Sequence, residues 1–159
     1  MAAGLPDCFK FNLWANLALL DFCAGLSEAQ LEAAVPGTYG SVKDTLVHLY
    51  SGEEGYARHF TGAYPTTPPL NDLTTFPGID ELRRRAERSG KELITIAETA
   101  DLDQVFHLDN GTYECPAIIV LIQAINHGDD HRSQICTVLS QQGLEAPCLD
   151  GWCYNEAPH

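Results

Sequence analysis

Three histidines, His48, His127 and His131, are the residues of this 159-residue sequence whose types and spacing best suit a chemical role. His127 and His131 are four residues apart in an apolar segment, and a helix there places both imidazoles on one face, about one turn apart. His48 lies between Leu46 and Leu49 in a second apolar segment, so a neighbouring helix can bring it opposite the pair. Three neutral imidazoles with an open fourth position form a metal site of the catalytic type.

The spacing of His127 and His131 does not by itself show that they bind a metal. With six histidines in 159 residues, a pair four residues apart arises by chance about 0.2 times per chain, and histidines on helices also form simple hydrogen bonds. Two zinc-protease motifs are absent, because Gly128 stands where H-E-x-x-H needs a glutamate and Asp130 where H-x-x-E-H needs one. The sequence also lacks a G-x-S-x-G motif, a phosphate-binding glycine loop and a dinucleotide fingerprint.

Four long segments have the apolar spacing of helices, and no alternating Val/Ile/Thr-rich series competes with them. His48 falls in the middle of the second segment, and the other two histidines fall in the fourth. The apolar stripe of the fourth segment places His127 and His131 at or beside the interior of a helical bundle. The four segments run from about Pro6 to Ala24, from Ser41 to about Phe60, from about Ile79 to Ala100, and from Pro116 to about Gln142.

Local signals mark the ends of these helices. Ser41 is a good N-cap for the second helix, and Ser27 opens a capping box for a short helix that stops near Pro36. Residues 62–77 contain four prolines and form a connector long enough to cover a site or to cross the bundle.

Two further features are expected near the fourth helix. The sequence Asp109-Asn110-Gly111 predicts a tight turn, and hence a small hairpin before that helix. The tail after Gly143 is too irregular for another long helix, and because it contains Trp152 and Tyr154 we expect the tail to dock on the bundle.

Composition and charge narrow the class of protein. The length favours one domain over residues 1–159, and 45% hydrophobic residues suit a folded chain. Nine Lys and Arg against 22 Asp and Glu give a net charge of −13, which argues against binding to nucleic acid or to an anionic membrane. Five of the nine cations fall in the third helix, at Arg83–Arg85, Arg88 and Lys91, and we expect them to form a solvated face.

The cellular compartment follows from two absences in the sequence. No stretch reaches the ~20 apolar residues that span a bilayer, and no charged n-region precedes the first apolar run. A cytoplasmic protein is therefore expected. The six cysteines contain no C-x-x-C pair, and we expect all of them to be reduced; they are Cys8, Cys23, Cys115, Cys136, Cys148 and Cys153.

Three stretches of the chain resemble the DinB/YfiT-like family of metalloenzymes. The first is FNLWANLALLDFCAGL, which is similar to the opening helix of the family, and the second is GTYGSVKDTLVHLYSGEEGY. The third, NHGDDHRSQICTVLSQQG, is similar to the signature of the last helix. The metal-ligand positions of the family fall on His48, His127 and His131. The chain departs from the family pattern at Asp130, often histidine, and at Ser133, commonly glycine; neither is a ligand position.

This resemblance implies an all-α fold, a four-helix bundle of up-down-down-up topology with a long crossover, and often a homodimer. It also implies a divalent metal, zinc or nickel, at one end of the bundle. Characterised members include thiol S-transferases and a mycothiol-dependent isomerase, in which the metal activates a low-molecular-weight thiol. The family name records induction by DNA damage, hence a stress response.

Three functions are compared on this basis. The first is a metal-dependent enzyme that transfers or activates a low-molecular-weight thiol, with a small-molecule substrate. The second is a metal-dependent hydrolase, in which Asp130 or Glu53 assists proton transfer. The third is a non-enzymatic metal-binding stress protein with a closed structural site, for which Glu53, Asp129 or a cysteine is the candidate fourth ligand.

Overall fold

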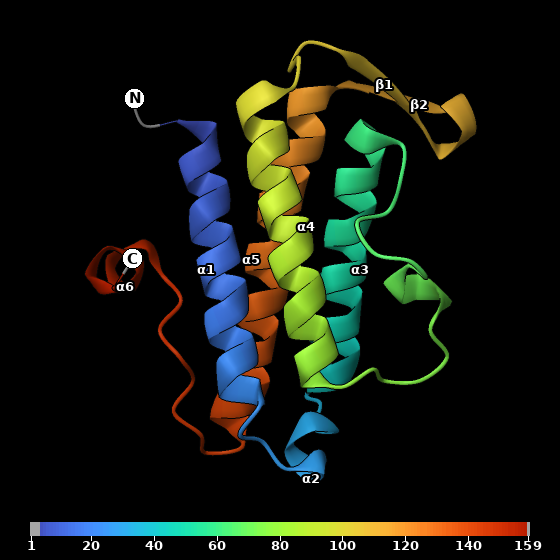
Figure 1. Ribbon diagram of the computed structural model, residues 1–159. Coiled ribbons are helices and arrows are strands. Elements are labelled where there is room, and N and C mark those ends of the chain that lie inside the picture. Colours follow the sequence, from blue (N-terminus) through green and yellow to red (C-terminus); the bar gives the residue numbers. More distant parts are fainter. Residues whose placement is uncertain (1–3, 159) are drawn as a thin grey trace.

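Four long helices form the body of the molecule in a computed structural model that describes residues 4–158 (Figure 1). Helices α1 and α5 run in one direction, whereas α3 and α4 both run in the other, so the bundle has the expected up-down-down-up topology. Each helix packs against two neighbours: α1 and α3 each contact both α4 and α5. The bounds are α1 Leu5–Cys23, α3 Val42–Thr61, α4 Ile79–Thr99 and α5 Ala117–Gln141.

The parallel arrangement of α3 and α4 requires a long crossover. Residues 62–78 leave the end of α3, return along the outside of the bundle and enter α4 at the end where α3 began (Figure 1). A single 3₁₀ turn, η1 Leu70–Asp72, interrupts this connector. The proline-rich segment therefore crosses the bundle, one of the two roles that its length allowed.

The signals at the helix ends act as the sequence predicts. The Ser41 hydroxyl accepts the backbone N–H of Asp44 at 3.1 Å, and Ser27 with Gln30 forms a capping box for the short helix α2 Glu28–Leu31. Helix α5 begins directly after Pro116. Gly143 follows it with a φ of +78°, a left-handed conformation that glycine adopts without steric cost.

The expected hairpin is present. Strands β1 Val105–Leu108 and β2 Tyr113–Pro116 pair antiparallel, with Val105 opposite Pro116 and Leu108 opposite Tyr113. The turn between them is η2 Asp109–Gly111, where Asn110 has a φ of +58°. Asparagine tolerates this left-handed conformation better than most residues do, which is why the sequence predicts the turn.

The bundle interior consists of two apolar clusters with a polar layer between them. Leu20, Leu46 and Leu139 belong to the first cluster, whereas Phe9 and Leu121 belong to the second. Along every long helix a buried polar residue falls between the positions that enter the two clusters. This polar layer comprises Asn12, Asn16, Glu53, Ser89 and Arg132.

One cation of the third predicted helix does not lie on a solvated face. Arg85 is only 4% exposed, and its guanidinium pairs with Glu54 of α3 at 2.9 Å and with Glu81 at 2.7 Å. The expectation of a wholly solvated run is therefore wrong at this position. It remains correct for Arg84 and Arg88, whose side chains are exposed.

The C-terminal tail docks on the bundle through one aromatic residue, Tyr154. The tail ends in a short helix, α6 Gly151–Glu156, whose Tyr154 contacts the rings of Phe11 and Trp14 on α1. The expected docking of the tail is therefore present, although Trp152 is 81% exposed and takes no part in it.

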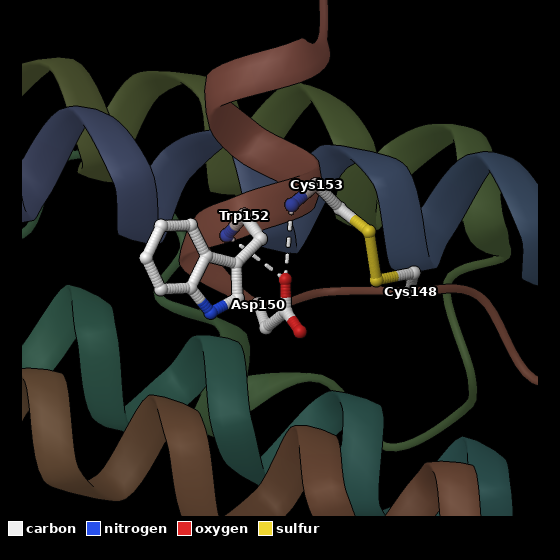
Figure 2. Close-up of a disulfide and its surroundings, with 4 residues drawn as sticks. All are labelled: Cys148, Asp150, Trp152 and Cys153. Carbon is white, nitrogen blue, oxygen red and sulfur yellow. Dashed lines mark hydrogen bonds between the residues drawn. A yellow bond between two sulfur atoms is a disulfide. The ribbon is translucent and has the colours of Figure 1, made fainter.

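The prediction that all six cysteines are reduced is also wrong, because Cys148 and Cys153 form a disulfide (Figure 2). Asp150 between them caps α6 by accepting the backbone N–H groups of Trp152 and Cys153, both at 2.9 Å. The resulting turn brings the Cα atoms of the two cysteines to 6.2 Å, within the normal range for a disulfide. The other four cysteines are free thiols.

Among residues 4–158, no helix combines the length and the apolar character that crossing a membrane requires.

Candidate metal centre

The structure brings the three predicted histidines together between two neighbouring helices. His48 comes from the middle of α3, and His127 and His131 come from successive turns of α5. The Nε2 atoms of His48 and His127 are 3.2 Å apart. One ring nitrogen from each of the three side chains can be chosen so that all lie within 4.8 Å of one another.

Two glycines allow the helices to approach closely enough for this cluster. A Cβ atom on Gly52 of α3 would lie 2.6 Å from Cε1 of His127, a distance that real Cβ atoms do not show. A Cβ on Gly128 of α5 would lie 2.8 Å from Oδ1 of Asn12 and 2.9 Å from Nη1 of Arg132. Larger residues at either position would therefore displace a ligand candidate or its support.

The geometry and chemistry of the cluster fit a divalent metal. Two imidazole nitrogens bound to one tetrahedral zinc ion at about 2.0–2.1 Å are separated by about 3.4 Å, close to the spacing between His48 and His127. The Nδ1 atom of His131 is buried, and no hydrogen-bond partner for it exists among residues 4–158. Neutral imidazole nitrogen is a preferred donor for zinc and nickel. The cluster can therefore hold such an ion.

The protonation state of the histidines favours ligation. The pKa of His127 is lowered to about 4, mainly by burial and to a smaller extent by the adjacent His131 and His48 rings. Burial also lowers the pKa of His48, with a smaller contribution from His131. Both imidazoles are consequently neutral at pH 7, as a metal ligand must be.

Tyr39, which the sequence analysis did not single out, completes the surroundings of the cluster. Its ring stacks on that of His48 with centroids 4.0 Å apart and meets the edge of His131 at 5.5 Å. Its backbone N–H donates to Oε1 of Gln134 on α5 at 2.8 Å, which ties the loop before α3 to the helix that carries two of the histidines. The only sequence signal is its place in the glycine-flanked segment just before the Ser41 cap.

A cavity of about 560 Å³ opens beside His48. The crossover forms one wall, including Asn71, Thr74 and Phe76, and α3 forms the other, including Lys43 and Ser51. We call it the polar cavity, because hydroxyl, amide and ammonium groups line it. The long connector thus both closes the topology and shapes the approach to the histidines.

Glu53, a candidate acid–base group and fourth ligand, has a different place. Its carboxylate accepts hydrogen bonds from the side-chain amides of Asn12 (2.9 Å) and Asn16 (3.1 Å) and from the Ser89 hydroxyl (3.3 Å). Arg132 donates to the amide oxygens of the same two asparagines at 2.7 and 2.8 Å. Glu53 is therefore a structural member of the polar layer and not of the histidine cluster.

Burial raises the pKa of Glu53 to about 7, although the positive charge of Arg132 and the hydrogen bonds from Ser89 and the asparagines favour the ionised form. The other acidic candidates are also engaged elsewhere. Asp130 accepts a hydrogen bond from Gln134 at 2.9 Å, and Asp129 lies 3.9 Å from the Arg132 guanidinium.

A second group of metal-ligating residue types occurs in the tail. Cys148, Asp150 and Cys153 offer ligand atoms within 4.8 Å of one another. Because the two sulfur atoms are bonded to each other, they are not thiolate ligands in this structure.

A mostly helical up-down-down-up bundle with three clustered histidines on neighbouring helices defines a class of proteins that can bind a divalent metal. Comparison with known sequences identifies the family. The chain belongs to the DinB family, whose sequence model matches residues 1–158. It is also similar to Protein DinB of Bacillus subtilis (strain 168), with 22% identity over 155 residues, 92% of this chain and 90% of that protein.

Proposed function

We propose that this protein is a divalent-metal-dependent enzyme of the thiol S-transferase type, in which His48, His127 and His131 bind zinc or nickel. The observation that supports this most is the open side of the cluster: three imidazoles converge, and one of them, His48, lines a cavity of about 560 Å³. Catalytic zinc sites keep one position free for a substrate or water, whereas structural sites are closed by a fourth protein ligand. No fourth ligand joins the cluster from residues 4–158.

A bound metal of this kind supplies the charge that deprotonates a coordinating thiol at neutral pH. Residues of the chain orient the histidines and bind the thiol substrate. Tyr39 fixes the orientation of His48 by stacking on it and shields one face of the cluster. Lys43, Asn71 and the threonines of the polar cavity can bind the amide and carboxylate groups of a small polar thiol.

The thiol reaction is favoured over hydrolysis by the positions of the carboxylates. Glu53 and Asp130 are the two groups considered as proton carriers for an attacking water. Glu53 is held by Asn12 and Asn16, and Asp130 accepts a hydrogen bond from Gln134; among the described residues neither carboxylate is hydrogen-bonded to a histidine ring of the cluster. A thiolate nucleophile needs no such base after the thiol proton has been released.

A cobalt-substituted protein tests this proposal. Adding the active low-molecular-weight thiol is expected to produce a sulfur-to-cobalt charge-transfer band in the near ultraviolet. The same thiol should be consumed in stoichiometry with an electrophilic acceptor, and His131→Ala should abolish both effects. A variant lacking Cys115 and Cys136 is the control for thiols of the protein itself, since both are free.

Two other outcomes of that experiment would contradict the proposal. An unchanged cobalt spectrum together with cleavage of esters or amides would indicate the metal-dependent hydrolase. A protein that binds metal but is inactive with both substrate classes would indicate the non-enzymatic stress protein. The homodimer and the cytoplasmic location expected from the sequence stay predictions.

A further inference from the structure

A second cavity, of about 260 Å³, lies between the hairpin and the adjoining faces of α3 and α5. Its walls include Tyr56 from α3, Leu108 and Cys115 from the two strands, and Ile119 and Val120 from the first turn of α5. None of the described residues that line it is an Asp, Glu, Lys or Arg. The lining histidine, His59, has its pKa lowered by burial and is neutral at pH 7. We call it the apolar cavity.

The apolar cavity shares a wall with the histidine cluster. The Tyr56 ring, which lines the cavity, stands edge-on to the ring of His127 with centroids 5.6 Å apart. Gln123, also in the lining, precedes His127 by one turn of α5 and interacts with the Tyr56 side chain. One aromatic ring therefore separates the apolar cavity from the cluster, whereas the polar cavity adjoins His48.

The size and lining of the apolar cavity suit a hydrocarbon group. An apolar cavity of about 150 Å³ is sufficient to bind benzene, and this one is larger. Leucine, isoleucine and valine side chains provide the contacts, and the wall shared with His127 is formed by Tyr56, whose side chain interacts with the Gln123 amide. A ligand with an apolar body and a reactive polar end would thus place that end toward the histidines.

We propose that the apolar cavity binds the alkyl or aryl part of the electrophile that accepts the thiol. This inference rests on the proposed function. The thiol occupies the polar cavity and the acceptor approaches from the opposite side of the cluster. In the step itself a sulfur–carbon bond forms, the bond from that carbon to its leaving group breaks, the leaving group takes the electron pair, and the thiol proton passes to solvent.

Toluene is a suitable probe, because it has the apolar body of such an acceptor but cannot react. Its binding to the metal-free and the zinc-loaded protein can be followed by amide chemical shifts in NMR titrations. We expect saturable shifts in the hairpin and the first turn of α5. Ile119→Asn should weaken toluene binding roughly tenfold, because a large apolar contact is replaced by a polar one.

Ile122→Asn is the matched control. Ile122 lies on the same helix and is exposed to a similar extent, 52% against 41% for Ile119, but it does not line the apolar cavity. Both sites are at the surface, so both variants should fold, which circular dichroism can check. Equal toluene affinity in the two variants, or no saturable binding to the parent protein, would overturn the inference.

Turnover tests whether the bound group belongs to the acceptor. With zinc-loaded protein and 2-mercaptoethanol as the thiol, Ile119→Asn should raise the KM for benzyl chloride about tenfold and leave that for iodomethane unchanged. Equal changes for both acceptors would contradict the inference while leaving the proposed function intact. A third outcome is that toluene binding depends on Ile119 but neither acceptor is turned over. The apolar cavity would then still be a ligand site, and the result would count against thiol transfer.

Discussion

The three histidines of the cluster differ in their surroundings. His48 is stacked under Tyr39, His127 lies against Gly52 and Tyr56, and the Nδ1 atom of His131 is buried without a partner among the described residues. The spacing of His127 and His131, together with the resemblance to the DinB/YfiT-like family, predicted the cluster. Tyr39 could not be predicted, because its contact with His48 depends on how the loop before α3 folds back over that helix.

The close approach of the His127 ring to Gly52 leads to a prediction for a single residue. Gly52→Ala should displace the His127 ring, weaken metal binding about tenfold and lower the free energy of unfolding by about 1–3 kcal/mol, because the new methyl group overlaps the ring. The control is Gly55→Ala on the same helix, where a Cβ meets nothing within 4 Å. That variant should keep its metal affinity and gain up to about 1 kcal/mol of stability from helix propensity. Isothermal titration with zinc and urea denaturation measure both quantities, and an unchanged affinity in Gly52→Ala would refute the argument.

At the scale of elements, the polar layer connects all four long helices. Asn12 and Asn16 on α1 bind both Glu53 on α3 and Arg132 on α5, and Ser89 on α4 donates to the same carboxylate. Gly52 and His131 are the chain neighbours of two members of this layer. The layer therefore fixes the register of α3 and α5, on which the distance between the histidines depends.

The sequence predicted the helices better than it predicted this layer. Caps at Ser27 and Ser41 and the stop at Gly143 act locally, so a single sequence reveals them. Glu53 was assigned to acid–base chemistry because its partners lie about 40 residues away on α1, and spacing within one helix says nothing about them. Arg85 was misjudged for the same reason, since Glu54 belongs to another helix.

The raised pKa of Glu53 leads to a prediction of pH-dependent stability. Between pH 4.5 and about 7 the folded protein keeps a proton on Glu53 that the unfolded chain has lost. The contribution of Glu53 to the free energy of unfolding is therefore fully present below pH 4.5. It is lost as the pH rises to about 7, a change of about 3 kcal/mol. His127 acts with the opposite sign, because its pKa is lowered from 6.5 to about 4.

Replacing Glu53 isolates its contribution. Relative to the parent protein, metal-free Glu53→Gln should gain stability as pH increases from 4.5 to 7. The reason is that glutamine does not ionise, so the variant does not lose the stability that the parent loses when Glu53 gives up its proton. Urea denaturation at half-unit pH steps measures the difference, with Glu98→Gln at an exposed position of α4 as control. A difference between Glu53→Gln and the parent that does not vary with pH would show that the carboxyl group does not titrate in this range.

At the scale of the whole molecule, the crossover that the topology requires also forms a wall of the polar cavity. Two parallel neighbouring helices need a connector that returns along the bundle, and residues 70–77 of that connector wall the cavity beside His48. A buried ion pair holds the connector in place. Glu54 accepts the backbone N–H of Leu70 at 2.8 Å, and Arg85 donates to the Pro68 carbonyl at 3.0 Å and pairs with Glu54 at 2.9 Å.

Removal of Arg85 should therefore disturb more than one helix. Arg85→Ala leaves the buried Glu54 without its cation and is expected to lower the free energy of unfolding by about 3–5 kcal/mol. Arg84→Ala, next along the same helix with a side chain 75% exposed, should change the stability by less than about 1 kcal/mol. Urea denaturation compares the two variants. Similar small effects in both would mean that the ion pair does not anchor the connector.

The metal content of the purified protein, measured by elemental analysis after dialysis at pH 7, tests the three-histidine site most directly. The account predicts one divalent ion per chain in the parent protein and in His107→Ala, whose histidine is exposed on the hairpin and pairs with Glu114. It predicts almost none in His48→Ala, His127→Ala or His131→Ala, because each removes one of three ligands and should weaken binding more than about 100-fold. Full occupancy in His127→Ala would contradict it.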